Sequence, residues 1–502
     1  MLPTIRHPTP HREQSVPSRF SPALACLLIC LAAVGCAPAD RYSYQAVKQE
    51  FAPVAPAASP PGPVAQAPPG PDLSQPLDLP GAIRLALAQN PDQEMALMRI
   101  RQSEAMLDQA LAAFLPMLSA YTEFARGDVP SGYLFKTIDQ RLLPPGTNFN
   151  DPGTFQNWES GLRARWNLFR GGQDYLRRQM ASLGLDISHL DRQALENSLV
   201  ASVIKGFYNC LAAGQFEEIA QQAVENVQVQ VRTAEVRFRG GGALKSDVLS
   251  LKVRLAQAQE DLVRARNNRL LALAALANLL GADPDTRLNL VPGQDPQAQV
   301  PPVYSQGVVQ ALEHRPELRK VRQQVVSARL ALEAARAEFL PRLDAQATYY
   351  WDDPLAQYQG DRGNYTYGLL LNWDLFTGLS TVKEGKKARA ALGEMLAADR
   401  KATLGIQLDV KSAYLGLAES LARLEVSQAA VDQAAEALKL VARQYQGGAV
   451  DVTRYLDADL NLNAARVRYA AASYDALKSR ADIARALGQW SELAAKEPGR
   501  HD

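Results

Sequence analysis

The chain has 502 residues, a formal net charge of +1 and 21% charged side chains. This length is enough for more than one ordinary domain. The balance of acidic and basic residues offers no basic patch of the kind that binds nucleic acid. Two of the four cysteines, Cys26 and Cys30, lie in an apolar N-terminal stretch. The other two, Cys36 and Cys210, do not make a disulfide framework.

Residues 1–35 are typical of a targeting segment. Three arginines precede an apolar run at 23–34, which is too short to cross a bilayer because a spanning helix takes about 20 residues. The run ends in the sequence AAVGC, where Gly35 precedes Cys36. This ending resembles the bacterial lipobox, in which the cysteine becomes the lipidated first residue. We therefore predict a lipoprotein signal peptide at 1–35; the alternative is ordinary signal cleavage that leaves Cys36 unmodified.

Residues 36–80 are rich in proline and alanine, as in APVAPAASPPGPVAQAPPGP. Such a composition cannot build a core, so we expect an extended tether behind the lipidated cysteine. This arrangement suits a protein held at a membrane surface. Ala37, rather than an aspartate, follows Cys36, which resembles lipoproteins that are sent to the outer membrane.

The rest of the chain consists of two copies of one unit. The sequence Phe-Leu-Pro at 114–116 recurs at 339–341, and WNLF at 166–169 recurs as WDLF at 373–376. The first copy is 18 residues longer between these motifs, so we expect a longer loop within 125–165. The matches divide the chain into a first repeat, a mid-height linker, a second repeat and a tail, at residues 81–281, 282–306, 307–488 and 489–502.

Each unit is predicted to contain a helix, two strands, a long helix, a tight turn and a returning helix. Apolar and polar residues alternate at about 117–126 and 156–168 in the first copy, and at about 342–351 and 364–375 in the second. This period of two predicts strands.

The helices are too long for a globular core. The proline-free stretch at 172–237 predicts a helix of roughly 100 Å at 1.5 Å per residue. Two shorter helices, expected at 243–280 and 307–338, together match this length, which places the linker at mid-height. Apolar and charged stripes along the helices favour side-by-side packing into a tube.

Two prolines, Pro116 and Pro341, stand where a helix gives way to a strand. Proline removes a backbone donor and disfavours helix in the residue before it. We expect both residues to stop a helix where the chain enters the membrane.

The strands have one apolar and one polar face. In the second strand, Trp158, Leu162 and Trp166 share one face, whereas Glu159 and Arg163 share the other. Four of the five tryptophans lie in the two hairpins. This pattern is typical of a membrane β-barrel wall; the alternative is a pair of strands in a soluble sandwich, which would need a second sheet.

Four strands cannot close a barrel, because the smallest bacterial barrels have eight, and an open edge in lipid is not viable. Oligomerisation is therefore required. A dimer would make eight strands around an interior filled by side chains, whereas a trimer would make twelve and leave a lumen. The predicted fold class is mainly α with membrane β: a long α-helical barrel continuous with a twelve-stranded β-barrel shared by a trimer.

The paired Phe-Leu-Pro sequences, the WNLF and WDLF strand ends and the sequence YQGGAVDVTRYLDA resemble the TolC-like outer-membrane efflux protein family over about residues 77–490. The resemblance implies a homotrimer in the outer membrane of a Gram-negative bacterium, with its helical barrel in the periplasm. It implies a passive exit duct for an inner-membrane efflux pump joined by a periplasmic adaptor protein. The N-terminal lipid resembles the subgroup that serves drug and metal pumps. An exit duct for type I protein secretion is the alternative.

In this family the periplasmic tip closes as an iris held by hydrogen bonds and salt bridges near the tight turns. In this chain those turns are expected at Gly240 and Gly241 and at Gly447 and Gly448. Tyr445 matches the family's tip tyrosine by position.

The resemblance also implies an acidic ring that narrows the entrance. Asp247 and Asp457 match its positions, whereas the second acidic position of the second tip is Arg454 here. This departure puts a doubled ring in doubt and favours a salt bridge with Asp457 on the same helix face. The alternative for Asp247 and for Asp451 is that they favour a helix N-terminus.

The sequence carries no recognisable catalytic constellation. The segment GLSTVKEGKKA has glycines too far apart for a phosphate loop, and no Cys or His pair has metal-ligand spacing. His189 and His314 fall within helical patterns and are expected on the surface. We therefore expect no enzyme activity, no cofactor and no metal.

Two other classes of protein stay open. A structural coiled-coil lipoprotein that transports nothing would not need two alternating hairpins with aromatic ends. A surface-anchored hydrolase would need catalytic residues that the sequence does not contain.

Lipidation of Cys36 is the first testable prediction, because AAVGC ends the apolar run. Mass spectrometry of the mature N-terminus should show a diacyl or triacyl cysteine, and Cys36→Ser should abolish the modification. An unmodified N-terminus at this residue would show that the run is an ordinary signal peptide.

Overall fold

The computed structural model describes residues 76–292, 301, 303–358 and 360–490. The signal peptide, Cys36 and nearly all of the tether expected at 36–80 lie outside these residues, as do parts of the linker and tail.

The described elements follow one order in both halves of the chain, and the helices have matching lengths of 11, 22 and 67 residues, ending with 35 and 36 residues. The first half contains α3 (Leu79–Gln89), α4 (Pro91–Ala112), β2 (Met117–Gly127), α5 (Pro130–Asp139), β3 (Phe155–Arg170), α6 (Gln173–Arg239) and α7 (Lys245–Leu279). The second contains α8 (Tyr304–His314), α9 (Pro316–Ala337), β5 (Arg342–Asp353), η2 (Gly360–Arg362), β6 (Gly363–Asn372), α10 (Ser380–Gln446) and α11 (Val452–Leu487). A short parallel pair joins β1 (Pro76–Leu77) to β4 (Asn289–Leu290).

Two expectations were wrong in detail. The helix expected at 307–338 is two helices, because Pro316 cannot donate to the preceding turn and Arg315 takes an extended ψ of 119°. The strand expected to reach 375 ends at Asn372, since no residue of β5 is left to pair beyond Arg342. The longer loop expected within 125–165 is confirmed, since 128–154 separate β2 from β3 whereas 354–362 separate β5 from β6; it also contains helix α5, which was not expected.

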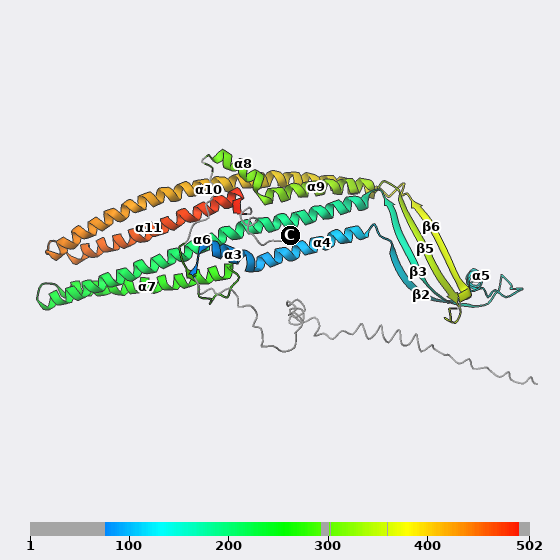
Figure 1. Cartoon of the computed structure of the whole chain (residues 1–502), viewed down its shortest axis with the longest axis horizontal. Coiled ribbons are helices and arrows are strands. Elements are labelled where there is room, and N and C mark those ends of the chain that lie inside the picture. Colours follow the sequence, from blue (N-terminus) through cyan, green and yellow to red (C-terminus); the bar gives the residue numbers. More distant parts are fainter. Residues whose placement is uncertain (1–75, 293–300, 302, 359, 491–502) are drawn as a thin grey trace, which may run out of the picture. The chain divides into compact units, whose positions relative to one another are not determined.

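The four long strands form one antiparallel sheet in the order β2-β3-β5-β6 (Figure 1). Residues that face each other across an antiparallel pair lie on the same face of the sheet. One rung therefore aligns Ala120, Leu162, Tyr349 and Tyr365, and the next aligns polar residues on the other face. The sheet has one apolar and one polar surface, and on the apolar surface Leu162 is 47% and Tyr365 74% exposed.

The change from helix to strand is built the same way twice. Helix α4 ends at Ala112 and α9 at Ala337, shortly before Pro116 and Pro341. A helix that stops leaves carbonyl groups without a partner. The indole of Trp166 donates to the carbonyl of Phe114 at 2.9 Å, and that of Trp373 donates to the carbonyl of Phe339 at 3.0 Å. Although 52 positions separate the two residues in the first copy and 34 in the second, the same hydrogen bond links Phe-Leu-Pro to the tryptophan in both.

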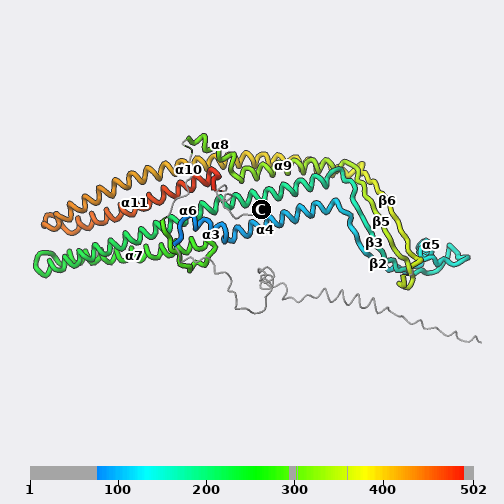
Figure 2. Tube along the Cα trace, in the orientation of Figure 1, coloured from blue at the N-terminus to red at the C-terminus, as the bar shows by residue number. Residues whose placement is uncertain are grey.

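The long helices run side by side in antiparallel pairs, α6 with α7 and α10 with α11 (Figures 1 and 2). Helix α6 is the central one: it also packs on α3, α4, α9 and α11. Eighteen of its residues are buried, against four in α10. None of the helices in the described part of the chain combines the length and the apolar character that crossing a bilayer takes.

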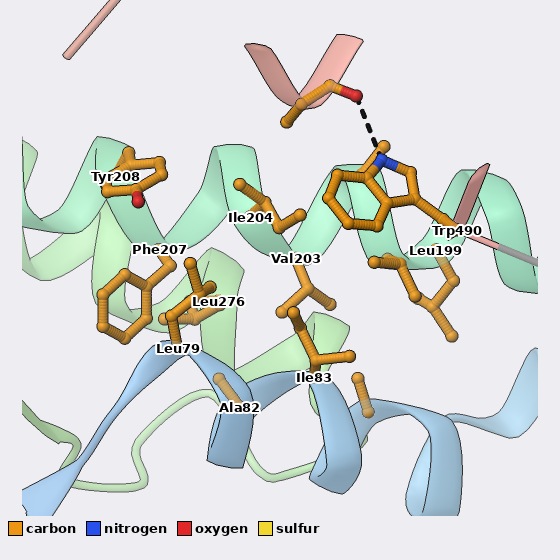
Figure 3. Packing of buried hydrophobic residues seen from close by; sticks show 14 of the residues in the cluster. Leu79, Ala82, Ile83, Leu199, Val203, Ile204, Phe207, Tyr208, Leu276 and Trp490 are labelled. Atoms are coloured by element: carbon orange, nitrogen blue, oxygen red, sulfur yellow. Dashed lines mark hydrogen bonds between the residues drawn. The ribbon is translucent and has the colours of Figure 1, made fainter. Parts of the chain in front are cut away.

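The largest apolar cluster lies where α3 meets the middle of α6. Figure 3 shows Leu79 and Ile83 of α3 facing Val203 and Phe207 of α6, all of them buried. Trp490 covers the cluster and donates its indole N–H to the carbonyl of Ala481 at 3.1 Å. This packing fixes the N-terminal helix against the longest one.

Two glycines after the returning helices lie against the backbone just before Pro91 and Pro316. Gly281 follows α7 with φ of 76°, and a Cβ there would lie 2.3 Å from the carbonyl oxygen of Gln89. Gly488 follows α11 with φ of 80° and lies against the backbone of Arg315. Both positions need a residue without a side chain, because the chain is left-handed there and the neighbouring backbone is in contact.

Ion pairs through Asp409 join Arg315, the residue before Pro316, to helices α10 and α11. The guanidinium of Arg315 donates to Asp409 of α10 at 2.5 Å, and Arg485 of α11 donates to the other carboxylate oxygen at 2.9 Å. Burial alone would raise the pKa of Asp409, but the hydrogen bonds from Arg485 and Arg315 outweigh it and lower the pKa. The carboxylate is therefore held ionised between two arginines.

The Gly281 contact gives a stability prediction. Gly281→Ala should lower the free energy of unfolding by about 2–4 kcal/mol, because the new methyl group meets backbone and the φ value suits glycine alone. Gly184→Ala is the matched control: it lies in α6, where an added Cβ meets nothing within 4 Å, and should be neutral or gain roughly 0.5–1 kcal/mol. Melting curves in detergent compare the two, and equal melting temperatures would contradict the close contact.

Candidate functional site

The two tight turns are nearly identical. Gly241 and Gly448 both take φ of 74°, whereas Gly240 and Gly447 stay at −85° and −82°. The amide of Gly242 donates to the carbonyl of Arg237, and that of Ala449 donates to Gln444, each five residues back. These are Schellman endings, in which a left-handed glycine lets the chain reverse. Among the four expected turn glycines, only Gly241 and Gly448 need glycine for their φ.

An aromatic pair from both sides of the second turn lies next to the first turn. The rings of Tyr445 and Tyr455 stack with centroids 5.5 Å apart, and the guanidinium of Arg237 lies 5.8 Å from the centroid of the Tyr445 ring. Burial and the nearby Asp247 carboxylate raise the pKa of Tyr445. The predicted tip residues Tyr445 and Asp247 are therefore neighbours, although 198 positions separate them in the sequence.

Below the turns, apolar side chains from α6, α7 and α11 form a separate buried cluster. Its members share positions that face the middle of the helix group: Val227, Val231, Ala234, Val248, Leu251 and Val452. Tyr445 packs against them from α10. The cluster joins the first turn to the second within one chain.

Two of the predicted acidic residues act at helix N-termini. Asp451 is the N-cap of α11, and its carboxylate accepts from the amide of Arg454 at 3.0 Å. Asp247 lies in the first turn of α7, where its carboxylate accepts from the amide of Leu244 at 3.3 Å. Both contacts satisfy amides that a helix start leaves unpaired, as the alternative interpretation of these residues expected.

Arg454 and Asp457 are exposed on α11. Within the described residues, no ion pair of 4.0 Å or less joins Arg454 to Asp457. Both side chains are therefore available to groups beyond this chain.

The sequence interpretation missed a buried charge pair one turn further along the helices. The guanidinium of Arg254 on α7 lies 4.0 Å from the carboxylate of Asp459 on α11, and both side chains are less than 10% exposed. Burial raises the pKa of Asp459, although Arg254 and Arg466 act in the opposite direction. The signal was available: Arg254 falls in register with the buried Leu251 and Ala258, so a charge occupies the apolar stripe.

A groove of about 550 Å³ runs beside this pair, between α6, α7 and α11. Its lining includes several alanines, among them Ala223 and Ala258, together with the charged side chains of Asp261, Arg264 and Arg468. Among the described residues, no cluster of three or more His, Cys, Asp and Glu side chains is placed to hold a metal ion. The contacts found at the turns are helix caps, ring contacts and an ion pair, whereas Pro116 and Pro341 follow the C-terminal ends of two other helices, α4 and α9.

The two interpretations of the acidic residues, as gate residues or as helix caps, predict different effects on the free energy of unfolding. Asp451→Ala should cost about 1 kcal/mol because the N-cap bond is lost, whereas Asp451→Ser should keep most of it. Asp457→Ala, an exposed carboxylate without a capping contact, should stay within about 0.5 kcal/mol. Chemical denaturation of the three variants measures this; a cost for Asp457→Ala as large as for Asp451→Ala would contradict the assignment.

Comparisons with known proteins agree with this architecture. The chain is 25% identical to the pyoverdine export outer membrane protein OpmQ of Pseudomonas aeruginosa, over 78% of this chain and 80% of that protein. It is 28% identical to the alkaline protease secretion protein AprF of the same organism, over 56% of this chain and 59% of that protein. The crystal structure of the outer membrane protein VceC of Vibrio cholerae superposes with a TM-score of 0.68 at 20% identity, over 82% of this chain and 96% of that one.

The model of the family described as outer membrane efflux protein matches residues 82–282 and 307–489. These two segments contain both turns, both Phe-Leu-Pro sequences and the whole four-stranded sheet. The resemblance seen in the sequence is confirmed, and the chain belongs to the outer membrane efflux protein family.

Proposed function

We propose that this protein is the outer-membrane exit duct of a tripartite efflux system and that it conducts its cargo passively. The observation that carries this proposal is the continuity between the two-faced sheet and the 67-residue helices α6 and α10, through corners closed by Trp166 and Trp373. A sheet with one apolar and one polar surface suits a barrel wall. Helices roughly 100 Å long extend the same path away from the membrane.

A homotrimer follows from the open edges of the sheet. Among the described strands, β2 and β6 each have a single neighbour, and unpaired strand edges are not tolerated in lipid. Three copies supply twelve strands and a lumen, whereas two supply eight strands around a filled interior. The exposed leucines of α10, such as Leu404 and Leu408, support the same assembly. The two halves of the chain then act as internal structural repeats around the tube.

The rest of the assembly follows from this orientation. The sheet lies in the outer membrane of a Gram-negative bacterium, and Cys36 carries the lipid anchor. The helices lie in the periplasm, where the turns at Gly241 and Gly448 meet a periplasmic adaptor protein and an inner-membrane pump. No enzyme activity and no cofactor belong to this function.

The turns form the gate of the proposed duct. Tyr445, with its neighbours Arg237 and Asp247, joins the two turns of one chain. Asp247 and Asp457 supply three copies each around the trimer axis, and Arg454 supplies a basic partner to a neighbouring chain. A narrow entrance lined by carboxylates favours cations.

A second candidate function is export of proteins. The 28% identity to the alkaline protease secretion protein AprF supports it, and an unfolded protein cargo needs the same continuous path. A structural coiled-coil lipoprotein is a third class. It has no use for a sheet whose apolar face is exposed at Leu369 and Tyr367.

Purified protein in planar bilayers tests the proposal. Native mass measurement should give three chains, and single-channel recordings should show a conducting, cation-preferring pore. Asp247→Ala with Asp457→Ala should lower the cation preference at least about twofold, because six carboxylates leave the entrance. Asp283→Ala with Asp285→Ala removes the same number of charges beyond α7 and is the control.

A companion variant tests the closed state. Tyr445→Phe with Arg454→Ser should raise the basal conductance by loosening the contacts at the turns. A stable monomer without conductance would overturn the proposed function. A conducting trimer whose selectivity and basal conductance are the same in all variants would place the gate elsewhere. Export of an unfolded protein cargo in cells would favour the secretion alternative.

A further inference from the structure

The segment between β2 and β3 is much longer than its counterpart in the second half. Residues 128–154 separate these strands, whereas 354–362 separate β5 from β6. The longer segment contains α5, whose residue Thr137 is buried. Figure 1 shows α5 beside the far ends of the four strands. An insertion of this kind in only one repeat points to a role that the duct itself does not require.

Helix α5 lies on the polar face of the sheet. Its side chains reach Asn157 and Glu159 of β3 and Asp352 of β5. Glu159 pairs with Asp352 across the strands, and both lie on the same face as Arg163. The ring of Phe155, on that face too, lies where a Cβ on Gly132 would meet it at 2.8 Å. Each of these contacts comes from the polar face.

Lys136 is the centre of this attachment. Its ammonium group donates to Glu159 at 2.5 Å and to Asp352 at 3.1 Å. The Asp352 side chain is completely buried, and one of its oxygens has no hydrogen-bond partner. Burial acts to lower the pKa of Lys136, but the bonds to Glu159 and Asp352 outweigh it and raise the pKa. The lysine therefore stays charged and neutralises carboxylates that would otherwise repel.

Further polar contacts extend the attachment across the sheet. The amide of Gln140 donates to the carbonyl of Gln156 at 2.9 Å and to Asn157 at 2.8 Å. Asn364 of β6 donates to the carbonyl of Asp139 at 3.2 Å. Helix α5 is thus bonded to β3, β5 and β6, so it is held over the sheet rather than standing away from it.

In a closed barrel the polar face of this sheet is the inner face, because the apolar face meets lipid. We propose that α5 lies inside the outer mouth of the duct, and that three copies held by Lys136 set the largest cargo that can leave. This size limit is separate from the gate at the turns. It rests on the proposed barrel, so the test must distinguish failure of the barrel from failure of the size limit.

Single cysteines in β6 provide that test in intact cells, whatever the state of the turns. Thr366→Cys lies on the polar face, paired with Thr348, and Leu369→Cys lies on the apolar face, paired with Ala345. Thiol-reactive polymers of graded mass are added from outside. Cys210 is buried and does not interfere.

The proposal predicts that Thr366→Cys reacts with small reagents and excludes large ones. Replacing residues 128–154 with the sequence of 354–362 should raise its rate with large reagents about tenfold, since the width of an entrance decides what passes. Lys136→Met should likewise raise the reaction rate with large reagents, whereas Lys136→Arg should leave this rate unchanged. Lys386→Met, at an exposed lysine of α10, is the control and should also leave it unchanged.

Each outcome is decisive. If Leu369→Cys reacts with polar reagents as fast as Thr366→Cys, the barrel itself is wrong. If only Thr366→Cys reacts but large polymers enter equally well with and without residues 128–154, the barrel stands and the size limit is overturned. If the loop exchange abolishes folding, the Lys136→Met and Lys136→Arg pair decides, because unchanged exclusion in both also overturns it.

Discussion

The architecture depends on turning a helix into a strand without leaving backbone groups unpaired. Helices α4 and α9 end shortly before Pro116 and Pro341, and the carbonyls of Phe114 and Phe339, just beyond these ends, have no helical amide to accept from. The indole of Trp166, in β3, and the indole of Trp373, one residue after β6, donate to these carbonyls. In each hairpin the indole donor lies near the end of the second strand. The same hydrogen bond therefore fixes the position at which β3 is followed by α6, and β6 by α10. The entry and the exit of each hairpin are thereby coupled.

Periodicity in the sequence located the long elements, because their environments are uniform along their lengths. Alternation marked β3 over most of Phe155–Arg170, and freedom from proline marked α6. Local exceptions were harder to find. The expected continuous helix at 307–338 ignored the backbone cost of Pro316. Helix α5 was not foreseen, because ten residues between two loops carry little period of their own and are held by contacts to distant strands.

The candidate site was predictable in its turns and not in its ion pairs. The turns could be placed at the two glycine pairs, but residue type alone did not separate Gly241 and Gly448, which are left-handed, from Gly240 and Gly447, which are not. The pairing of Arg254 with Asp459 depends on how two helices 205 positions apart are set against each other. Likewise, Asp451 can be named as an N-cap from its place before α11, but the stack of Tyr445 on Tyr455 requires knowing how tightly the turn closes.

The unequal burial of α6 and α10 has a consequence for biogenesis. The two helices have the same length, yet α10 buries only four residues within its own chain, and leucines such as Leu396, Leu415 and Leu440 are left open to water. In the proposed trimer, neighbouring copies cover these side chains, so a single chain exposes an apolar strip along a helix roughly 100 Å long before it assembles. The lifetime of the single chain depends on how often it meets other copies and on the supply of holdase chaperones. The expression level therefore affects the yield of assembled protein through mass action.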